Sequence, residues 1–188
     1  MYLITGLPRS RTAWMAAYLS SLNSTCYHEP LKMMCSYRDL GGIFRKGEGV
    51  SDSGASMLLG SILKEFYVPT LIIERDIQAV HTSLIKLGID MLSSLEAMQL
   101  NLSRYWGHPL VKKVAFDDLN NPTIMQSILN HLGIDASNYY NKLNVYRDLN
   151  VTIDMGVIER WSIVNAEGQK LIYNEMVEEV RSCLGLQL

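Results

Sequence analysis

Short runs of apolar residues alternate along the chain with longer segments in which apolar positions recur every three or four residues. The short runs have the length of buried strands, and the longer segments have the period of amphipathic helices. Five strands are predicted, near residues 2–5, 24–27, 49–52, 70–74 and 111–116. Strands that alternate with helices predict an α/β fold, a three-layer sandwich with a central parallel sheet of about five strands.

The segments between these strands have the apolar periodicity of helices. Helices are expected near residues 12–22, 55–66, 76–88, 91–106 and 122–132. The last has the clearest end signals, because Asn121 can cap its start, Pro122 suits its first position and Gly133 suits its end. A further helical segment over 31–39 is expected to be broken at Gly41-Gly42.

The C-terminal quarter of the chain shows a different pattern. Helices are predicted near residues 136–144 and 168–184, the latter from apolar positions that recur at helical spacing. We therefore expect residues 1–188 to form a single domain, with a helical C-terminal tail from about residue 136 that packs across one face of the sheet.

Composition excludes several classes of protein. The formal net charge is −2, so no overall basic field predicts a nucleic-acid partner, and any anion site must be local. No apolar run approaches membrane-spanning length, and the first strand begins without the basic and apolar regions of a signal peptide. The three cysteines lack the spacing of a zinc site. We expect a cytoplasmic protein that binds neither nucleic acid nor membrane.

The first twenty residues contain the strongest functional signal. A strand is followed by the turn Gly6-Leu7-Pro8-Arg9-Ser10-Arg11 and then by the start of a helix. The first amides of a helix have no internal partners and favour an anion in front of them, and Arg9 and Arg11 add positive charge. The segment therefore predicts a phosphate-binding loop, although an ordinary turn with two solvated arginines is the alternative.

The loop differs from that of nucleoside triphosphatases. Their pattern G-x-x-x-x-G-K-[ST] carries a lysine for the terminal phosphates and a hydroxyl for magnesium. Aligned on Gly6, this chain has Thr12 in place of the lysine and Ala13 in place of the hydroxyl residue. A metal-bound triphosphate is therefore not expected, and no metal site is predicted.

Residues 6–14 read G-x-P-R-S-x-T-x-W, which resembles the 5′-phosphosulfate loop, G-x-P-[RK]-S-G-T-[TS]-W, of P-loop sulfotransferases that use 3′-phosphoadenosine 5′-phosphosulfate (PAPS). Arg11 replaces a glycine of that pattern, and Ala13 replaces a hydroxyl residue. The chain is similar to small bacterial or phage-like members. The resemblance implies a P-loop sulfotransferase-like fold and a PAPS site that includes Gly6, Pro8, Arg9, Ser10, Arg11, Thr12, Ala13 and Trp14.

A second stretch extends the resemblance. In these sulfotransferases an arginine and a serine eight residues later bind the 3′-phosphate of the nucleotide, and Arg75 and Ser83 have this spacing directly after a predicted buried strand. The alternative pairs Arg75 with Asp76 or Asp52 and leaves Ser83 without a role. Residues 111–135 resemble the family's "V-x-Y-E-D-L" strand and the helix that follows it. The family's late Arg-Lys-Gly stretch is not found.

The catalytic base is expected after the second strand. His28-Glu29-Pro30 resembles an E-P step of bacterial sulfotransferases, in which the glutamate is the general base. Glu29 is thus the predicted base, with His28 as second choice, and Arg9 is expected to neutralise the charge that develops on the departing phosphate. If the first two strands are neighbours, Glu29 lies beside the loop. Asp52, at another strand end, is expected either to orient an acceptor or to pair with an arginine.

Together these signals predict a sulfotransferase that moves a sulfuryl group from the donor nucleotide PAPS to a hydroxyl or amine of a small-molecule or other unidentified acceptor. Two alternatives stay open: a non-catalytic nucleotide-binding or interaction module with an altered loop, and a nucleotide or metabolite kinase. The missing lysine and hydroxyl argue against the kinase. The acceptor is expected to contact the 31–49 segment and the tail.

Overall fold

The computed structural model of the chain describes residues 1–20, 25–139, 143, 144, 146, 150–153, 161–164 and 170–172. These residues belong to two compact units, Met1–Ile134 and Asp135–Leu188. Among the described residues, no helix has the length and apolar character needed to cross a bilayer.

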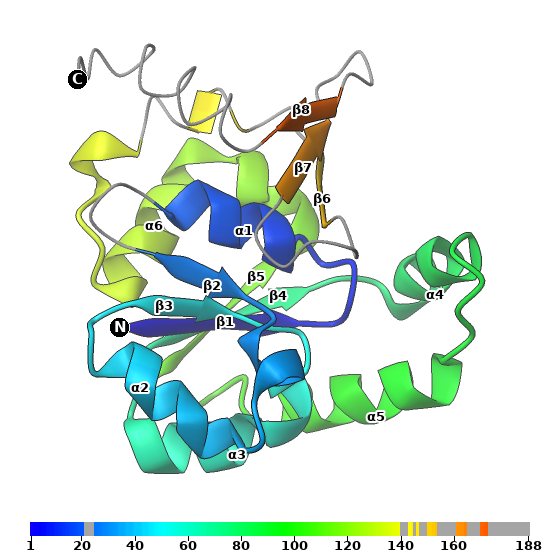
Figure 1. The fold of residues 1–188 in the computed structure, drawn as a ribbon, viewed down its shortest axis with the longest axis horizontal. Coiled ribbons are helices and arrows are strands. Elements are labelled where there is room, and N and C mark those ends of the chain that lie inside the picture. Colours follow the sequence, from blue (N-terminus) through cyan, green and yellow to red (C-terminus); the bar gives the residue numbers. More distant parts are fainter. Residues whose placement is uncertain are drawn as a thin grey trace. The chain divides into compact units, whose positions relative to one another are not determined.

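The first unit is built on a five-stranded sheet in which all strands are parallel. Its strands are β1 (Tyr2–Gly6), β2 (Cys26–His28), β3 (Gly49–Ser51), β4 (Thr70–Glu74) and β5 (Val111–Ala115). Their order is β2-β3-β1-β4-β5, with β1 at the centre (Figure 1). The predicted α/β class and five-stranded parallel sheet are confirmed.

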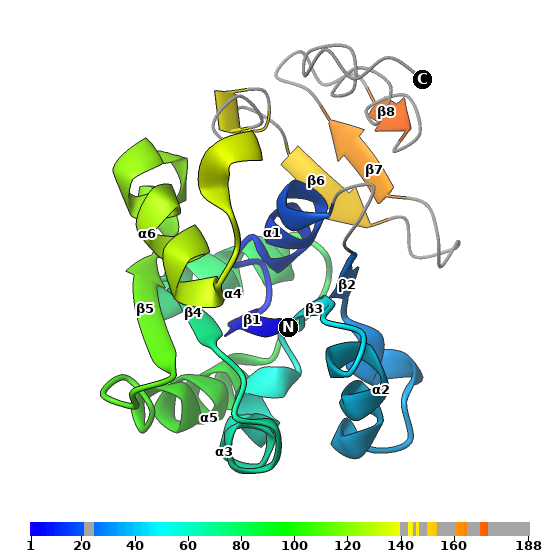
Figure 2. The same ribbon diagram turned by 90° about the vertical axis from the view of Figure 1, so that its left-hand side faces the viewer.

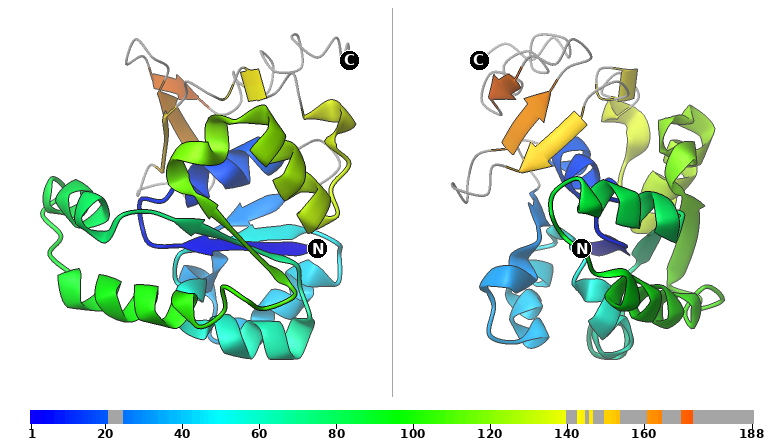
Figure 3. Two further views of the ribbon diagram at one scale, coloured as in Figure 1. Left: turned by 180° about the vertical axis from the view of Figure 1, so that it is seen from behind. Right: turned by 90° about the vertical axis from the view of Figure 1, so that its right-hand side faces the viewer.

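Helices cover both faces of this sheet. The α-helices are α1 (Thr12–Leu19), α2 (Leu40–Phe44), α3 (Ala55–Phe66), α4 (Ile77–Ile85), α5 (Leu92–Ser103) and α6 (Pro122–Leu132). Helices α1 and α6 lie on one face, and α2, α3 and α5 lie on the other (Figures 1 and 2). The short 3-10 turns η1 (Pro30–Met33) and η2 (Tyr37–Asp39) follow β2, and η3 (Phe116–Asn120) follows β5. The molecule seen from behind shows α4 beyond the carboxyl ends of the strands (Figure 3).

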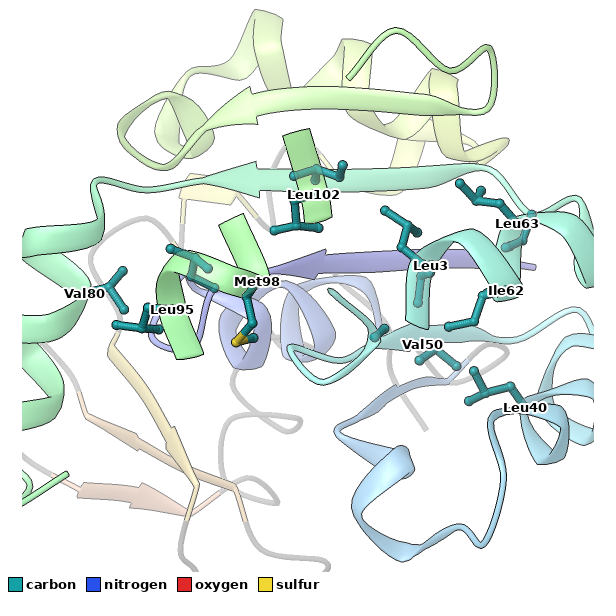
Figure 4. Packing of buried hydrophobic residues seen from close by; sticks show 14 of the residues in the cluster. Leu3, Leu40, Val50, Ile62, Leu63, Val80, Leu95, Met98 and Leu102 are labelled. Carbon is teal, nitrogen blue, oxygen red and sulfur yellow. The ribbon is translucent and has the colours of Figure 1, made fainter. Parts of the chain in front are cut away.

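The core of the first unit follows from the apolar strands. Every residue of β1 is buried, and Leu3 and Ile72 pack in one cluster with Val50 of β3. Side chains from α3 and α5 complete this cluster, including Ile62, Leu63, Leu95, Met98 and Leu102 (Figure 4). Burying a side chain of this size stabilises the fold by about 1.5–3 kcal/mol. The central strand is thus held by an apolar core, to which Leu7 of the loop also belongs.

Two details differ from the sequence-based expectations. Strand β3 lies between β1 and β2, so the first two strands are not neighbours, and Glu29 is held beside β3 by a backbone hydrogen bond to Ser51 (2.9 Å). Gly41 and Gly42 lie inside α2 instead of breaking a helix. A Cβ atom at Gly41 would lie 3.1 Å from the Phe66 ring, so close packing explains a glycine there.

The second unit contains a three-stranded antiparallel sheet. Its elements are η4 (Ala136–Asn138), β6 (Asn150–Ile153), β7 (Trp161–Val164) and β8 (Lys170–Ile172), with strand order β6-β7-β8. The prediction of a purely helical tail is therefore wrong, because β8 occupies part of the expected 168–184 helix. The remainder of that range lies outside the described residues. The single-domain organisation stays a prediction.

Candidate functional site

The loop between β1 and α1 is shaped by close backbone contacts. A Cβ atom at Gly6 would lie 2.6 Å from the carbonyl oxygen of Ile73, so only glycine fits where β1 meets β4. Beyond it the chain turns, with the Ser10 amide donating to the Leu7 carbonyl at 3.2 Å, and α1 begins at Thr12. The loop thus ends on the unpaired first amides of a helix.

Left-handed backbone conformations concentrate at this site. Among the described residues, four that are not glycine have positive φ, and three of them are site residues: Arg9 (65°), Arg11 (59°) and Glu29 (51°). Such conformations cost on the order of 1–3 kcal/mol and persist where the surrounding structure imposes them. Arg11 occupies the position at which the sulfotransferase loop has glycine. Its backbone therefore keeps a conformation that glycine favours.

The two segments that sequence analysis singled out meet in space. Arg9 Nε donates a hydrogen bond to Ser83 Oγ at 3.2 Å, and Arg75 Nη1 donates to the carbonyl oxygen of Arg9. Burial lowers the pKa of Arg75, and the charge of Arg9 lowers it further. The alternative pairing of Arg75 with Asp52 is not formed, because the Asp52 carboxylate accepts from backbone amides.

Three guanidinium groups gather around this loop without carboxylate partners. Among the described residues, Arg9, Arg11 and Arg75 have no carboxylate within 4.0 Å. Burial lowers the pKa of Arg11, which the charge of Asp117 partly offsets. The charge of Asp117 acts on both Arg11 and Arg75 but forms no ion pair with either, so the cluster keeps an excess of positive charge that suits an anion.

Phe116 and Asn120 hold two of these arginines in place. The Phe116 ring centroid lies 4.1 Å from the Arg75 guanidinium carbon and 4.9 Å from that of Arg11. Arg11 Nη1 also donates to Asn120 Oδ1 at 2.8 Å. Sequence reasoning missed both η3 residues. The available signal was their position directly after β5, at the sheet edge where ligands bind in parallel folds.

The remaining loop residues are buried to different degrees. The side chains of Ser10 and Thr12 are buried, and Ser10 Oγ has no hydrogen-bond partner among the described residues. Ser51 Oγ donates to the Thr12 carbonyl at 2.8 Å. Trp14 stacks on Tyr18 at 5.1 Å in the core and contacts the loop through Arg11 at 5.6 Å. Pro8 and Ala13 are half-buried.

Glu29 is a largely buried carboxylate, 11% exposed, with both oxygens engaged. Its Oε1 accepts from Ser53 Oγ at 2.5 Å and from the Ser53 amide at 3.2 Å, and its Oε2 pairs with Lys32 Nζ at 2.7 Å. Burial favours a higher pKa for Glu29, but the hydrogen bonds from Lys32 and Ser53 outweigh it and the pKa is lowered. Glu29 is therefore ionised at neutral pH, the state that a general base requires.

His28 connects Glu29 to the start of α1. Its Nε2 lies 3.8 Å from Glu29 Oε1 and 3.4 Å from Thr12 Oγ1. Burial lowers the pKa of His28 to about 4, although the charge of Glu29 opposes the shift. The imidazole is therefore neutral near pH 7 and a weak base.

Asp52 has a structural role. Its side chain accepts hydrogen bonds from the backbone amides of Leu31 (2.9 Å), Gly54 (2.8 Å) and Ala55 (3.3 Å), and burial raises its pKa. These bonds fix the start of α3 and the turn after Glu29. Among the described residues Asp52 forms no ion pair with an arginine, and its other expected role, to orient an acceptor, stays a prediction.

A cleft of about 580 Å³ opens beside the loop. Its polar end contains Glu29, Lys32, Asp52 and Ser53, and Pro8 of the loop borders it. Most of its walls come from α3 and from the segment that leads into and along α5, and the 31–49 segment contributes Leu31 and Lys32. The expected contribution of the tail stays a prediction.

Within the described residues, no three side chains of His, Cys, Asp or Glu gather closely enough to hold a metal ion. No protein-family model and no curated protein matches the chain.

Proposed function

We propose that the chain is a sulfotransferase that transfers the sulfuryl group of PAPS to an acceptor. The observation that carries this proposal is the cluster of Arg9, Arg11 and Arg75, three cations without carboxylate partners in the described part of the chain, around a strand-to-helix loop. The 5′-phosphosulfate would lie at the loop amides from Ser10 to Ala13, and Arg9 would neutralise it. Arg75 and Ser83 would hold the 3′-phosphate.

The transfer needs a donor, an acceptor and a base in one place. The acceptor hydroxyl oxygen forms a bond to sulfur, the bond from sulfur to the 5′-phosphate oxygen breaks, and adenosine 3′,5′-bisphosphate leaves. The hydroxyl proton passes to Glu29 and then to solvent. The hydroxyl becomes strongly acidic as the new bond forms, so a carboxylate with a lowered pKa suffices as base.

The cleft supports Glu29 over His28 as that base. Glu29 lines the cleft beside Pro8 of the loop, whereas His28 is not among the lining residues. The neutral His28 instead lies between Glu29 and Thr12, with its Nε2 3.4 Å from Thr12 Oγ1 and 3.8 Å from Glu29 Oε1.

A second candidate is a nucleotide-binding module without catalysis. The observation that favours it is the engagement of both Glu29 oxygens, by Lys32 and Ser53. In a working enzyme, the acceptor hydroxyl would have to donate to the same carboxylate, beside Lys32 on Oε2 or in place of one of these hydrogen bonds. A kinase has less support, because the loop lacks the lysine and hydroxyl that handle a magnesium triphosphate.

The test uses donor labelled with sulfur-35 and a panel of alcohols, phenols, sugars and amines. We expect labelled product and an equal amount of adenosine 3′,5′-bisphosphate, unchanged by EDTA. Tight binding of the bisphosphate without transfer to any acceptor favours the non-catalytic module. Magnesium-dependent release of phosphate from ATP contradicts the proposal in favour of a kinase.

A further inference from the structure

The cleft beside Glu29 has walls of flexible aliphatic side chains. Apart from Pro8 at the loop, these apolar lining residues are Leu31, Met57, Leu58, Met91, Ala97 and Met98, and no aromatic ring is among the described residues that line it. Methionine side chains are unbranched and adapt to irregular ligands. Met57 is 54% exposed and Leu58 38% exposed, so apolar surface in the cleft faces solvent.

Several side chains at the polar end of the cleft are engaged with one another or with the backbone. Lys32 Nζ and Ser53 Oγ both bond to Glu29, and Asp52 accepts from backbone amides. Two carboxylates and one ammonium leave this end with a net negative charge. It is therefore suited to a neutral hydroxyl group that donates its proton to a carboxylate, and unsuited to an anionic acceptor.

We infer that the acceptor is a neutral aliphatic alcohol, with its hydroxyl at Glu29 and its alkyl chain between α3 and α5. This inference rests on the proposed function and narrows it. The alcohol oxygen forms the bond to sulfur, the sulfur–oxygen bond to the 5′-phosphate breaks, and the proton moves to Glu29. The products are an alkyl sulfate and adenosine 3′,5′-bisphosphate.

The length of the alkyl chain gives the first test. Each buried methylene group strengthens binding by about fourfold, so kcat/KM should rise by about this factor per carbon from butanol to octanol. The binding of butyl to octyl sulfate, measured by calorimetry without donor nucleotide, should follow the same trend, because the sulfate of the product would lie at the loop with Arg9 and not against the carboxylates. Hexanoate, which has a chain of similar length and a negative charge, should bind far more weakly than hexanol.

A variant that fills the cleft with a larger side chain tests whether the alkyl chain of the acceptor binds there. Ala97 is exposed on α5 and lines the cleft, and its neighbour Glu96 is also exposed but does not line it. Ala97→Trp should reduce kcat/KM for octanol at least tenfold and leave the affinity for adenosine 3′,5′-bisphosphate unchanged. Glu96→Trp, the matched control, should change neither.

The outcomes separate this inference from the proposed function. Transfer to phenols or sugars but not to alkanols, or a rate independent of chain length, overturns the inference and leaves the sulfotransferase standing. An equal loss in Ala97→Trp and Glu96→Trp also overturns it. Alkyl sulfates that bind with the expected trend, without transfer to any acceptor, support the alkyl cleft and overturn the proposed function.

Discussion

The side chains of Arg9 and Ser83 meet although 74 residues separate them, with Arg9 Nε 3.2 Å from Ser83 Oγ. Arg9 belongs to the loop after β1, and Ser83 belongs to α4, which follows β4. Because β1 and β4 are paired in the sheet, their carboxyl ends lie side by side and bring the two segments together. One bound nucleotide can therefore contact both the loop that contains Arg9 and the helix that contains Ser83, which two separate sequence patterns predict.

Removing the Ser83 hydroxyl should weaken recognition of the 3′-phosphate. We expect Ser83→Ala to lower the affinity for adenosine 3′,5′-bisphosphate by at least about tenfold, since one hydrogen bond to a charged group contributes roughly 1.5–3 kcal/mol. The affinity for adenosine 5′-phosphate should stay the same. Calorimetry with both nucleotides measures this, and Ser93→Ala on α5 is the matched exposed control. Equal losses for both nucleotides would assign Ser83 a structural role.

The left-handed backbone at Arg11 predicts that a glycine variant is more stable than an alanine variant at this position. Both Arg11→Gly and Arg11→Ala lose the hydrogen bond to Asn120 and the contact with Phe116, so both should be less stable than the parent chain. At φ 59° alanine is strained by about 1 kcal/mol and glycine is not, so Arg11→Gly should be the more stable variant by about that amount. Urea denaturation measures the difference. An alanine variant as stable as the glycine variant would contradict a left-handed backbone at this position.

Glu29→Gln should test the general base. Glutamine keeps the size and polarity of the side chain but does not accept a proton, so turnover should fall by about 10²–10⁴-fold. The affinity for adenosine 3′,5′-bisphosphate should change little. Glu65→Gln is the control, because Glu65 also pairs with a cation, Arg38, at 3.3 Å but lies outside the cleft. Full turnover in Glu29→Gln together with its loss in His28→Ala would make His28 the base.

Burial of His28 should make stability depend on pH. Its pKa is about 4 in the folded chain and 6.5 when unperturbed, so the unfolded chain binds more protons between these values. Stability should therefore fall as the pH is lowered from 6.5 towards 4, with a slope that approaches about 1.4 kcal/mol per pH unit. Urea denaturation between pH 5 and pH 6.5 measures the slope. His28→Asn should flatten it, and an unchanged slope in that variant would exclude His28 as the cause.

Much of the first unit could be predicted from local pattern alone. Strand β4 is a continuous apolar run after a proline, and α6 begins after Asn121, whose side chain accepts from the amides of Thr123 and Ile124. These signals depend only on neighbouring residues. The order of the strands in the sheet does not depend on neighbouring residues, because only tertiary contacts place β3 between β1 and β2. The same holds for Gly41, whose place inside α2 depends on the distant Phe66 ring.

The charged residues of the site could be predicted from the sequence, but the residues that hold the arginines in place could not. Arg9, Arg75 and Ser83 are visible as a spaced pattern, whereas Phe116 and Asn120 reach the loop only after β5 joins the sheet. In the second unit, local pattern predicted the wrong type of element, a helix where the structure has a strand. Apolar residues near Ile172 fit a helical period, while the β-branched Val151, Ile153 and Ile163 of its antiparallel strands favour the extended chain.

The affinity for adenosine 3′,5′-bisphosphate relative to adenosine 5′-phosphate tests the central claim most directly. The two ligands differ only in the 3′-phosphate, which we expect Arg75 and Ser83 to bind. Calorimetry should show at least about tenfold tighter binding of the bisphosphate, since one charge-assisted hydrogen bond contributes roughly 1.5–3 kcal/mol. Arg75→Ala should abolish the difference, and Arg38→Ala on η2 should preserve it. Equal affinity of the parent chain for the two nucleotides would contradict a 3′-phosphate site at Arg75.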